Sequence, residues 1–113
     1  MSCLFCKIVQ GEIPASIVFD DPEIMAFRDI APQAPTHLLI IPKKHIATIN
    51  DVSANDEQLL GRMTILAKQL AMTEGCSTDG YRLIYNVNAG AGQAVYHIHM
   101  HVLGGRQFSW PPG

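Results

Sequence analysis

The sequence of 113 residues has little charge of either sign and no long hydrophobic run. Eight basic residues stand against ten acidic ones, and the net charge of −2 gives no electrostatic basis for nonspecific binding to nucleic acid or to a membrane surface. The longest uninterrupted aliphatic run, residues 38–41, is far shorter than the roughly 20 residues that cross a bilayer. The first residues lack a basic segment followed by an apolar run, so we expect no secretory signal and a cytoplasmic protein.

The length of 113 residues indicates one domain, spanning residues 1–113, that is long enough to form a hydrophobic core. A composition of 48% hydrophobic and 16% charged residues is typical of a folded globular protein. One long helix is expected, because Leu59, Met63, Leu66 and Leu70 form a single apolar stripe. The β-prone runs around it indicate an α+β fold with a mostly antiparallel sheet of about five strands. The expected helices span residues 4–10 and 54–74, and the expected strands span residues 17–19, 24–27, 36–41, 81–87 and 95–103.

Only five histidines occur, and three of them fall within the stretch VYHIHMHVLGG. Alternate residues of a strand face the same side, so His97, His99 and His101 should share one face while the apolar residues between them pack under the long helix. Their face should be a site, because burying three imidazoles in an apolar core is costly. The outer two would lie about 13 Å apart, too far for one metal to bind all three with bonds of about 2.1 Å. The row is therefore expected to serve two purposes, and a plain solvent-exposed row is the alternative that the clustering disfavours.

The loop before this row, residues 88–94, is rich in small residues. Gly90 and Gly92 permit backbone conformations that turn successive N–H groups toward an anion. The spacing lacks the following helix of a dinucleotide-binding motif or a P-loop, so by itself the loop indicates no more than a turn. Beside an imidazole row it favours a phosphate cradle, because imidazole can attack phosphorus and act as a general acid near neutral pH.

The three cysteines are an odd number in a chain without an export signal, which does not favour a disulfide framework. Cys3 and Cys6 have the C-x-x-C spacing that commonly forms half of a zinc site. The alternative is two reduced cysteines on a short amphipathic helix. The other half of a zinc site would have to be histidine or carboxylate, and the candidates are His45 and one member of the histidine row.

The stretch HIHMHVL at residues 97–103 resembles the signature of the histidine triad (HIT) family. The resemblance extends along nearly the whole chain through CKIVQGEIPA, FRDIAPQAPTHLLIIPKKHI and NVNAGAGQAVYHIHMHVLGGRQFSWPPG. The runs IAPQAPTHLLIIPKKH and LGGRQFSWPPG are similar to the Hint branch, the nucleoside phosphoramidate hydrolases. This resemblance implies a HIT-like α+β protomer that forms a homodimer with the two sheets joined. It also implies hydrolysis of the P–N bond of purine nucleoside 5′-phosphoramidates and related nucleotidyl conjugates.

The resemblance also implies roles for individual residues. His99 corresponds to the nucleophile that forms a nucleotidyl-histidine intermediate. His101 corresponds to the residue that contacts the phosphate or leaving group and assists proton transfer, and His37 to the one that supports the nucleophile. Asp29 corresponds to the carboxylate that binds the ribose hydroxyls. The remaining residues of the implied nucleotide site are Asn86, Gly92 and Gln93 near the phosphate, Leu4, Phe5, Ile8, Phe27 and Ile30 around the base, and Trp110 in the tail that reaches toward the partner subunit.

Zinc-binding members of the wider family use residues that correspond to Cys3, Cys6, His45 and His97. The resemblance thus implies a structural zinc ion, with no cofactor needed for the chemistry. Some Hint proteins lack these cysteines, so the fold does not require the metal.

One position departs from the Hint pattern, which has serine where this chain has Ala94. The missing hydroxyl puts the rate and the leaving-group preference in doubt and lends some weight to an alternative function, a purine-nucleotide-binding or scaffold protein with only residual hydrolysis. A purely structural zinc module is disfavoured, because it would leave His37, His99 and His101 without a purpose.

Overall fold

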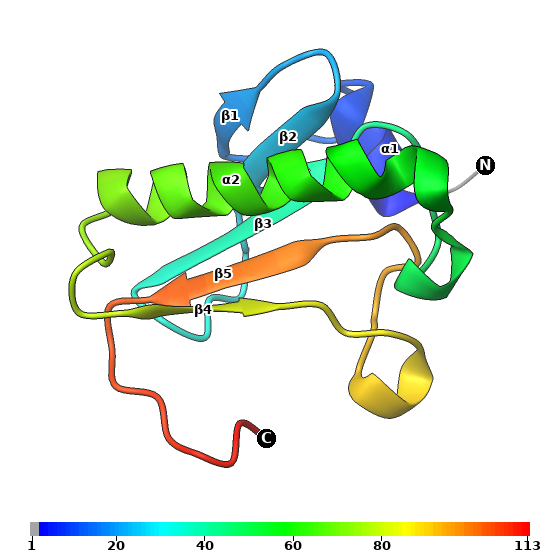
Figure 1. The fold of residues 1–113 in the computed structure, drawn as a ribbon. Helices are drawn as coiled ribbons and strands as arrows, with labels where there is room; N and C mark the ends of the chain where they lie inside the picture. Colours follow the sequence, from blue (N-terminus) through cyan, green and yellow to red (C-terminus); the bar gives the residue numbers. More distant parts are fainter. Residues whose placement is uncertain (1–2) are drawn as a thin grey trace.

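The structure, a computed structural model, describes residues 3–113 as one five-stranded antiparallel sheet with a helix on each face (Figure 1). The strand order is β1-β2-β3-β5-β4, so β1 and β4 form the two edges. The expected fold class is confirmed. The elements are α1 (Leu4–Val9), β1 (Ile17–Asp20), β2 (Ile24–Arg28), β3 (Thr36–Pro42), η1 (Ile49–Asp51), η2 (Ala54–Asp56), α2 (Glu57–Thr73), β4 (Tyr81–Ile84), η3 (Ala89–Ala91) and β5 (Met100–Gly104).

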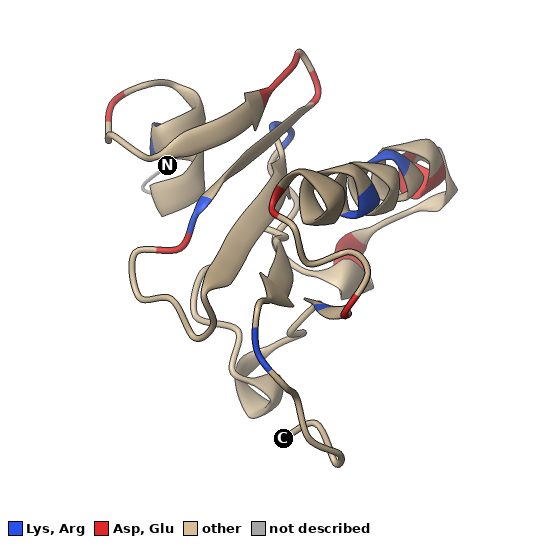
Figure 2. Cartoon of the chain, turned by 90° about the vertical axis from the view of Figure 1, so that its left-hand side faces the viewer, with Lys and Arg blue, Asp and Glu red and all other residues tan. Residues whose placement is uncertain are grey.

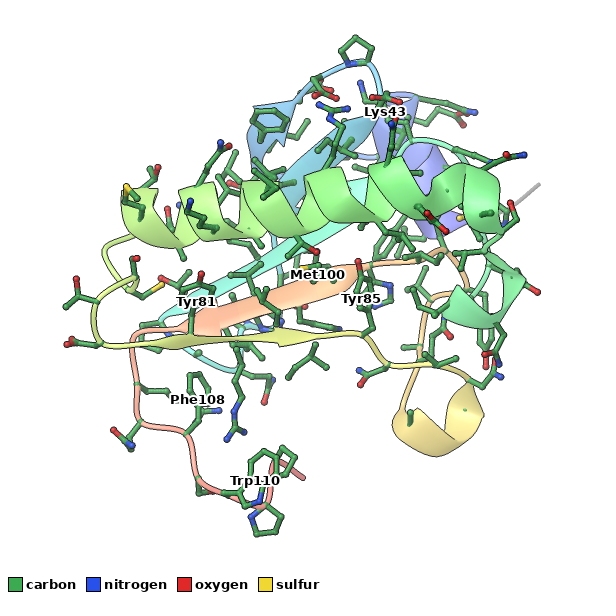
Figure 3. All side chains as sticks on the ribbon, viewed as in Figure 1. Lys43, Tyr81, Tyr85, Met100, Phe108 and Trp110 are labelled. Atoms are coloured by element: carbon green, nitrogen blue, oxygen red, sulfur yellow. The ribbon has the colours of Figure 1, made fainter. Side chains whose placement is uncertain are left out.

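Side chains alternate between the two faces of the central strands. One face packs under α2 in a core that contains Ile40, Met63 and Met100, and Figure 3 shows Met100 beneath this helix. The opposite face of β2 and β3 packs against α1 through Phe5 and Ile8. The molecule therefore has three layers, and the histidines of β3 and β5 belong to the α1 side.

Helix α2 is held at its start and along its outer face by polar contacts. The Asp56 carboxylate accepts a hydrogen bond from the Ser53 backbone N–H at 3.0 Å and pairs with the Lys44 ammonium at 2.7 Å. Midway along the helix, Arg62 pairs with Asp21 and Glu23 of the β1–β2 turn. Figure 2 shows charged residues on α2 and at the hairpin turn, while most of the sheet carries none. No helix within residues 3–113 is long and apolar enough to cross a membrane.

The expected element bounds were wrong at three places. The region expected to be one helix from residue 54 begins with the 3₁₀ turn η2 before α2 starts at Glu57. The strand expected over residues 95–103 joins the ladder only at Met100. Pro42 at the end of β3 has no N–H to donate and its carbonyl accepts from the His97 side chain, while the Ile98 N–H bonds the Ile46 carbonyl. The strand expected over residues 81–87 ends at Ile84, the last residue of the β4–β5 ladder.

Two methionines of α2 offer a matched test of this packing. Met63 is completely buried in the core, whereas Met72 on the same helix is 62% exposed. We expect Met63→Ala to lower the free energy of unfolding by about 2–5 kcal/mol, because it removes buried contacts and leaves a cavity. Met72→Ala should change it by less than about 0.5 kcal/mol. Urea denaturation of both variants measures the difference, and equal losses would contradict the placement of α2.

Candidate active site and metal site

A cleft on the α1 side of the sheet brings together most of the residues expected to bind nucleotide. Its volume is about 310 Å³. A larger groove of about 800 Å³ between the β1–β2 hairpin and α2 contains no histidine, so the smaller cleft is the candidate site. The lining residues of the cleft are Leu4, Phe5, Ile8, Ile13, Pro14, Ala15, Phe27, Arg28, Asp29, Ile30, Leu39, Ala94, Val95, His99 and His101.

His37 and His101 are joined by a hydrogen bond whose direction the backbone determines. Antiparallel register places Leu39 opposite His101, so His37, two residues away on the same face, is the diagonal neighbour of His101. The Gln33 backbone N–H donates to His37 Nδ1 at 3.0 Å, so neutral His37 carries its proton on Nε2. The His37 Nε2 atom lies 2.9 Å from His101 Nδ1, to which it donates, and 3.4 Å from Asp29 Oδ2. His101 then accepts at Nδ1 and keeps its own proton on Nε2, available to a ligand.

His99 has the complementary arrangement. Its Nδ1 lies 2.9 Å from the His97 carbonyl oxygen, which can only accept, so neutral His99 carries its proton on Nδ1 and leaves the Nε2 lone pair free. The rings of His99 and His101 are 5.0 Å apart between centroids, and the Phe5 ring meets His99 edge-on at 5.1 Å. The cleft therefore presents an unprotonated nitrogen and an N–H donor side by side.

Burial keeps His37 and His101 neutral near pH 7. It lowers the pKa of His101 to about 4, with neighbouring His99 and His37 acting in the same direction and Asp29 opposing them. Burial also lowers the pKa of His37, again against the effect of Asp29. Neutral rings keep the distinct donor and acceptor nitrogens described above, whereas an imidazolium would present two donors.

The other expected nucleotide-site residues lie at varied distances from the cleft. Asp29 lines it, while its Oδ1 accepts from the Ala31 backbone N–H at 2.8 Å in a tight turn. Ile30 is fully exposed at the rim, and Trp110 is 82% exposed on the C-terminal tail, where Figure 3 shows it well away from the sheet. Asn86 is half-buried just beyond β4 and does not line the cleft.

The glycine loop is held together by the side chain of Gln93. Its Oε1 accepts from the Asn88 backbone N–H at 2.8 Å, and its Nε2 donates to the carbonyls of Ala47 and Val95 at 2.8 and 3.0 Å. These bonds occupy the amide, so the side chain organises the loop. The backbone N–H groups of Gly92 and Gln93 also bond within the loop, to the carbonyls of Ala89 and Asn88 at 3.0 and 3.1 Å, and neither residue lines the cleft, so the structure does not turn these N–H groups toward an anion as the sequence predicted. Gly92 has a positive φ of +88°, a conformation in which glycine avoids the strain of other residues.

Four side chains at the other end of the histidine row converge on one point. Cys3 Sγ and Cys6 Sγ lie 3.4 and 3.6 Å from His97 Nδ1, and His45 Nδ1 lies 3.2 Å from the same nitrogen and 3.4 Å from Cys6 Sγ. In a tetrahedral zinc site with bonds of about 2.1 Å to nitrogen and 2.3 Å to sulfur, neighbouring ligand atoms lie about 3.4–3.8 Å apart. His97 Nε2–H donates to the Pro42 carbonyl at 2.7 Å, which leaves Nδ1 as the ligand atom. The donor set and its spacing therefore fit one zinc ion.

Two features of the site could not be predicted from the sequence. The cleft wall formed by residues 13–15 follows a turn and carries no pattern that distinguishes it from an ordinary loop. The backbone groups of Gln33 and Pro42, which determine where the imidazole protons lie, exist at every residue and become special only through the fold.

Known proteins share both the sequence and the fold. The model of the HIT domain family matches residues 10–108. A purine nucleoside phosphoramidase of Escherichia coli (strain K12) is 60% identical over 103 residues, which cover 91% of this chain and 87% of that protein. A HIT family hydrolase from Legionella pneumophila Philadelphia 1 has a crystal structure that superposes with a TM-score of 0.97 at 70% identity, covering 99% of this chain and 100% of that one. A histidine triad protein from Clostridium difficile superposes with a TM-score of 0.92 at 36% identity, covering 96% of this chain and 95% of that one.

The family match extends over most of the chain, and the expected resemblance is confirmed. The protein belongs to the HIT domain family and is a hydrolase of that family.

Proposed function

We propose that the protein hydrolyses purine nucleoside 5′-phosphoramidates and related nucleotidyl conjugates to the nucleoside monophosphate. One observation carries the proposal: the cleft sets a free imidazole nitrogen on His99 beside an imidazole N–H on His101. A nucleophile and a proton donor in adjacent positions are what displacement at phosphorus with an amine leaving group requires. The phosphoramidase activity in the name of the Escherichia coli relative supports the same substrate class.

The proposed reaction has two steps. His99 Nε2 attacks the α-phosphorus, a P–N bond forms to the ring, and the original P–N bond breaks with its electron pair going to the amine. The His101 Nε2–H assists by donating to the phosphate or to the departing nitrogen. An anionic phosphate in the cleft favours protonated His101, because opposite charge raises the pKa of an imidazole. Water then attacks the nucleotidyl-histidine, which releases the monophosphate and restores His99.

The shape of the cleft supports a nucleoside as the bound group. Leu4, Phe5 and Ile8 of α1 line an apolar cleft suited to a purine ring, and Phe27 of β2 packs edge-on against Phe5 in the same wall. Asp29 at the mouth offers a carboxylate to the ribose hydroxyls. Net charge plays no part in this recognition, because the ligand contacts are local.

A nucleotide-binding or scaffold protein with residual hydrolysis is the second candidate, and Ala94 favours it. This residue lines the cleft without a hydroxyl group to meet a leaving group. The intact arrangement of His37, His99 and His101 favours the enzyme, since binding alone does not require defined proton positions on three rings.

We also propose that residues 1–113 act as one cytoplasmic domain that forms a homodimer and takes nucleotides, not nucleic acid or membrane, as its partners. The free edge strand β4, with Leu83 39% exposed, supports pairing of two sheets. The Cys3, Cys6, His45 and His97 group would hold a structural zinc ion that tethers the N-terminal segment to the sheet.

Replacement of the nucleophile tests the proposed reaction. We expect His99→Ala to lower kcat on an adenosine phosphoramidate by more than about 10³-fold, because the covalent route is lost, while AMP still binds. Steady-state and single-turnover assays measure the first effect, and calorimetric titration with AMP measures the second. Lys68→Ala, an exposed change on α2 across the sheet, should leave both unchanged. Single-turnover activity retained in His99→Ala would refute the mechanism.

Removal of one cysteine tests the metal site. Protein purified without chelator should contain about one zinc ion per chain by elemental analysis. Cys6→Ala should lose most of this zinc, because one of four ligands is gone. Cys76→Ala, at the cysteine outside the group, should retain it. A folded wild-type protein without metal would contradict the zinc proposal.

The lowered pKa of His101 predicts a pH dependence of stability. Its pKa of about 4 in the folded protein lies below the ordinary value of 6.5, so the unfolded chain gains a proton first as the pH falls. The stability from neutral His101 is present above pH 6.5 and is lost between about pH 6.5 and 4. Compared with His101→Gln, the wild type should lose more stability across this range, by up to about 1.4 kcal/mol per pH unit. If the free energy of unfolding, measured by urea denaturation, had the same pH dependence in both proteins, half-buried His101 would not be held neutral in the folded state.

A further inference from the structure

The candidate metal site and the nucleophile share His97. Its side chain contributes Nδ1 to the metal group, and its backbone carbonyl accepts the hydrogen bond from His99 Nδ1 at 2.9 Å. The other ring nitrogen of His97 is fixed by the Pro42 carbonyl at 2.7 Å. A ligand bond at Nδ1 would therefore complete the immobilisation of the residue whose carbonyl determines the position of the proton on His99.

Helix α1 provides a second connection. Cys3 caps this helix, and its Sγ accepts from the Cys6 backbone N–H at 3.4 Å, so both thiols belong to the same turn. Phe5 lies between them in sequence and packs edge-on against His97 at 6.0 Å and His99 at 5.1 Å. Six residues are too few for a helix to be stable without external contacts. Ligation of its two cysteines would hold in place the wall that contacts the nucleophile.

The metal group also borders the cleft through a shared piece of chain. A hollow of about 560 Å³ beside Cys3 and His45 is bounded by Ala94 and Val95, which line the cleft on their other side. His45 is exposed to solvent, so the metal position is reachable from outside. The site is thus placed to affect the cleft and is accessible to exchange of its ion.

We propose that the Cys3–Cys6–His45–His97 site is a positioning device for the reaction, in which metal ligation holds the His97 carbonyl and α1 so that His99 keeps its proton on Nδ1. His97 and Phe5 are the positioning residues, and neither takes part in the chemistry. This goes beyond a metal that only tethers the N-terminus, because it makes the state of the nucleophile depend on occupancy. The proposal rests on the phosphoramidase function proposed above.

The test compares zinc-loaded protein, zinc-free protein, and two variants of His45, a ligand that does not line the cleft. His45→Ala removes a ligand, whereas His45→Cys preserves a tetrahedral set. We expect ¹⁵N NMR of ¹⁵N-histidine-labelled protein to show His99 protonated on Nδ1 in the loaded wild type and in His45→Cys, and a mixture of tautomers in the zinc-free wild type and in His45→Ala. The kcat of the zinc-free wild type and of His45→Ala should fall about 10- to 100-fold, because the nucleophile is no longer oriented.

An unchanged His99 tautomer in folded, zinc-free protein would overturn the proposal, and so would a wild type that binds no Zn²⁺. If the zinc-free protein unfolds, Phe5→Leu and Phe27→Leu in the zinc-loaded state decide the matter. The two rings touch each other at 5.4 Å, but only Phe5 joins α1 to His99. Only Phe5→Leu should then change the tautomer ratio, and equal ratios would overturn the proposal. The NMR measurement needs no substrate, so a failure of the phosphoramidase assignment is seen separately, as a wild type that does not turn over the phosphoramidate.

Discussion

The two-residue alternation of side chains through residues 97–102 is the constraint on which the rest of the structure depends. Ile98, Met100 and Val102 are almost completely buried under α2, and this burial pins the backbone from one side. The histidines between them must then face the other layer, where α1 lies. The alternation continues through His97 and His99 although these residues precede the hydrogen-bonded strand, because Ile98 is held by its own backbone bond to Ile46 at 2.8 Å.

The direction of the hydrogen bonds, more than their length, gives the cleft imidazoles defined donor and acceptor nitrogens. Two backbone groups of fixed character, the Gln33 N–H and the His97 carbonyl, act on His37 and His99 and determine the tautomer of every imidazole at the cleft. Burial lowers the pKa of His37 and of His101, so these two rings stay neutral near pH 7 and keep their distinct donor and acceptor nitrogens. The site therefore has defined donors and acceptors before any ligand arrives, and binding need not supply that organisation.

The sequence could predict whatever depends on residue type and period. The apolar stripe of α2 and the alternation after Val95 indicated the fold class and the face of the strand that packs under the helix. The C-x-x-C spacing indicated one half of a metal site, and the family resemblance named His45 and His97 as the other half. The strand ends could not be predicted, since β5 starts only at Met100, after a stretch in which the Pro42 carbonyl bonds the His97 side chain, 55 residues away in the sequence, and the Ile98 N–H bonds Ile46. The role of the Gln93 side chain in holding the loop could not be predicted either, because its partners Asn88, Ala47 and Val95 come together only in the folded protein.

The same contacts explain how a metal site and a nucleophile can lie two residues apart without interfering. A metal ion held by the cysteines could also bind any other imidazole lone pair within reach. His99 is the next histidine after the metal ligand His97, so its lone pair must be kept away from the ion. The His99 nitrogen nearest the backbone, Nδ1, carries a proton that the His97 carbonyl holds, so it offers no lone pair to an ion. The lone pair on Nε2 belongs to a ring that lines the cleft, and neither Cys3 nor Cys6 lines that cleft. One carbonyl thus separates the two tasks of the row, and this is why the residue that provides it must itself be held firmly.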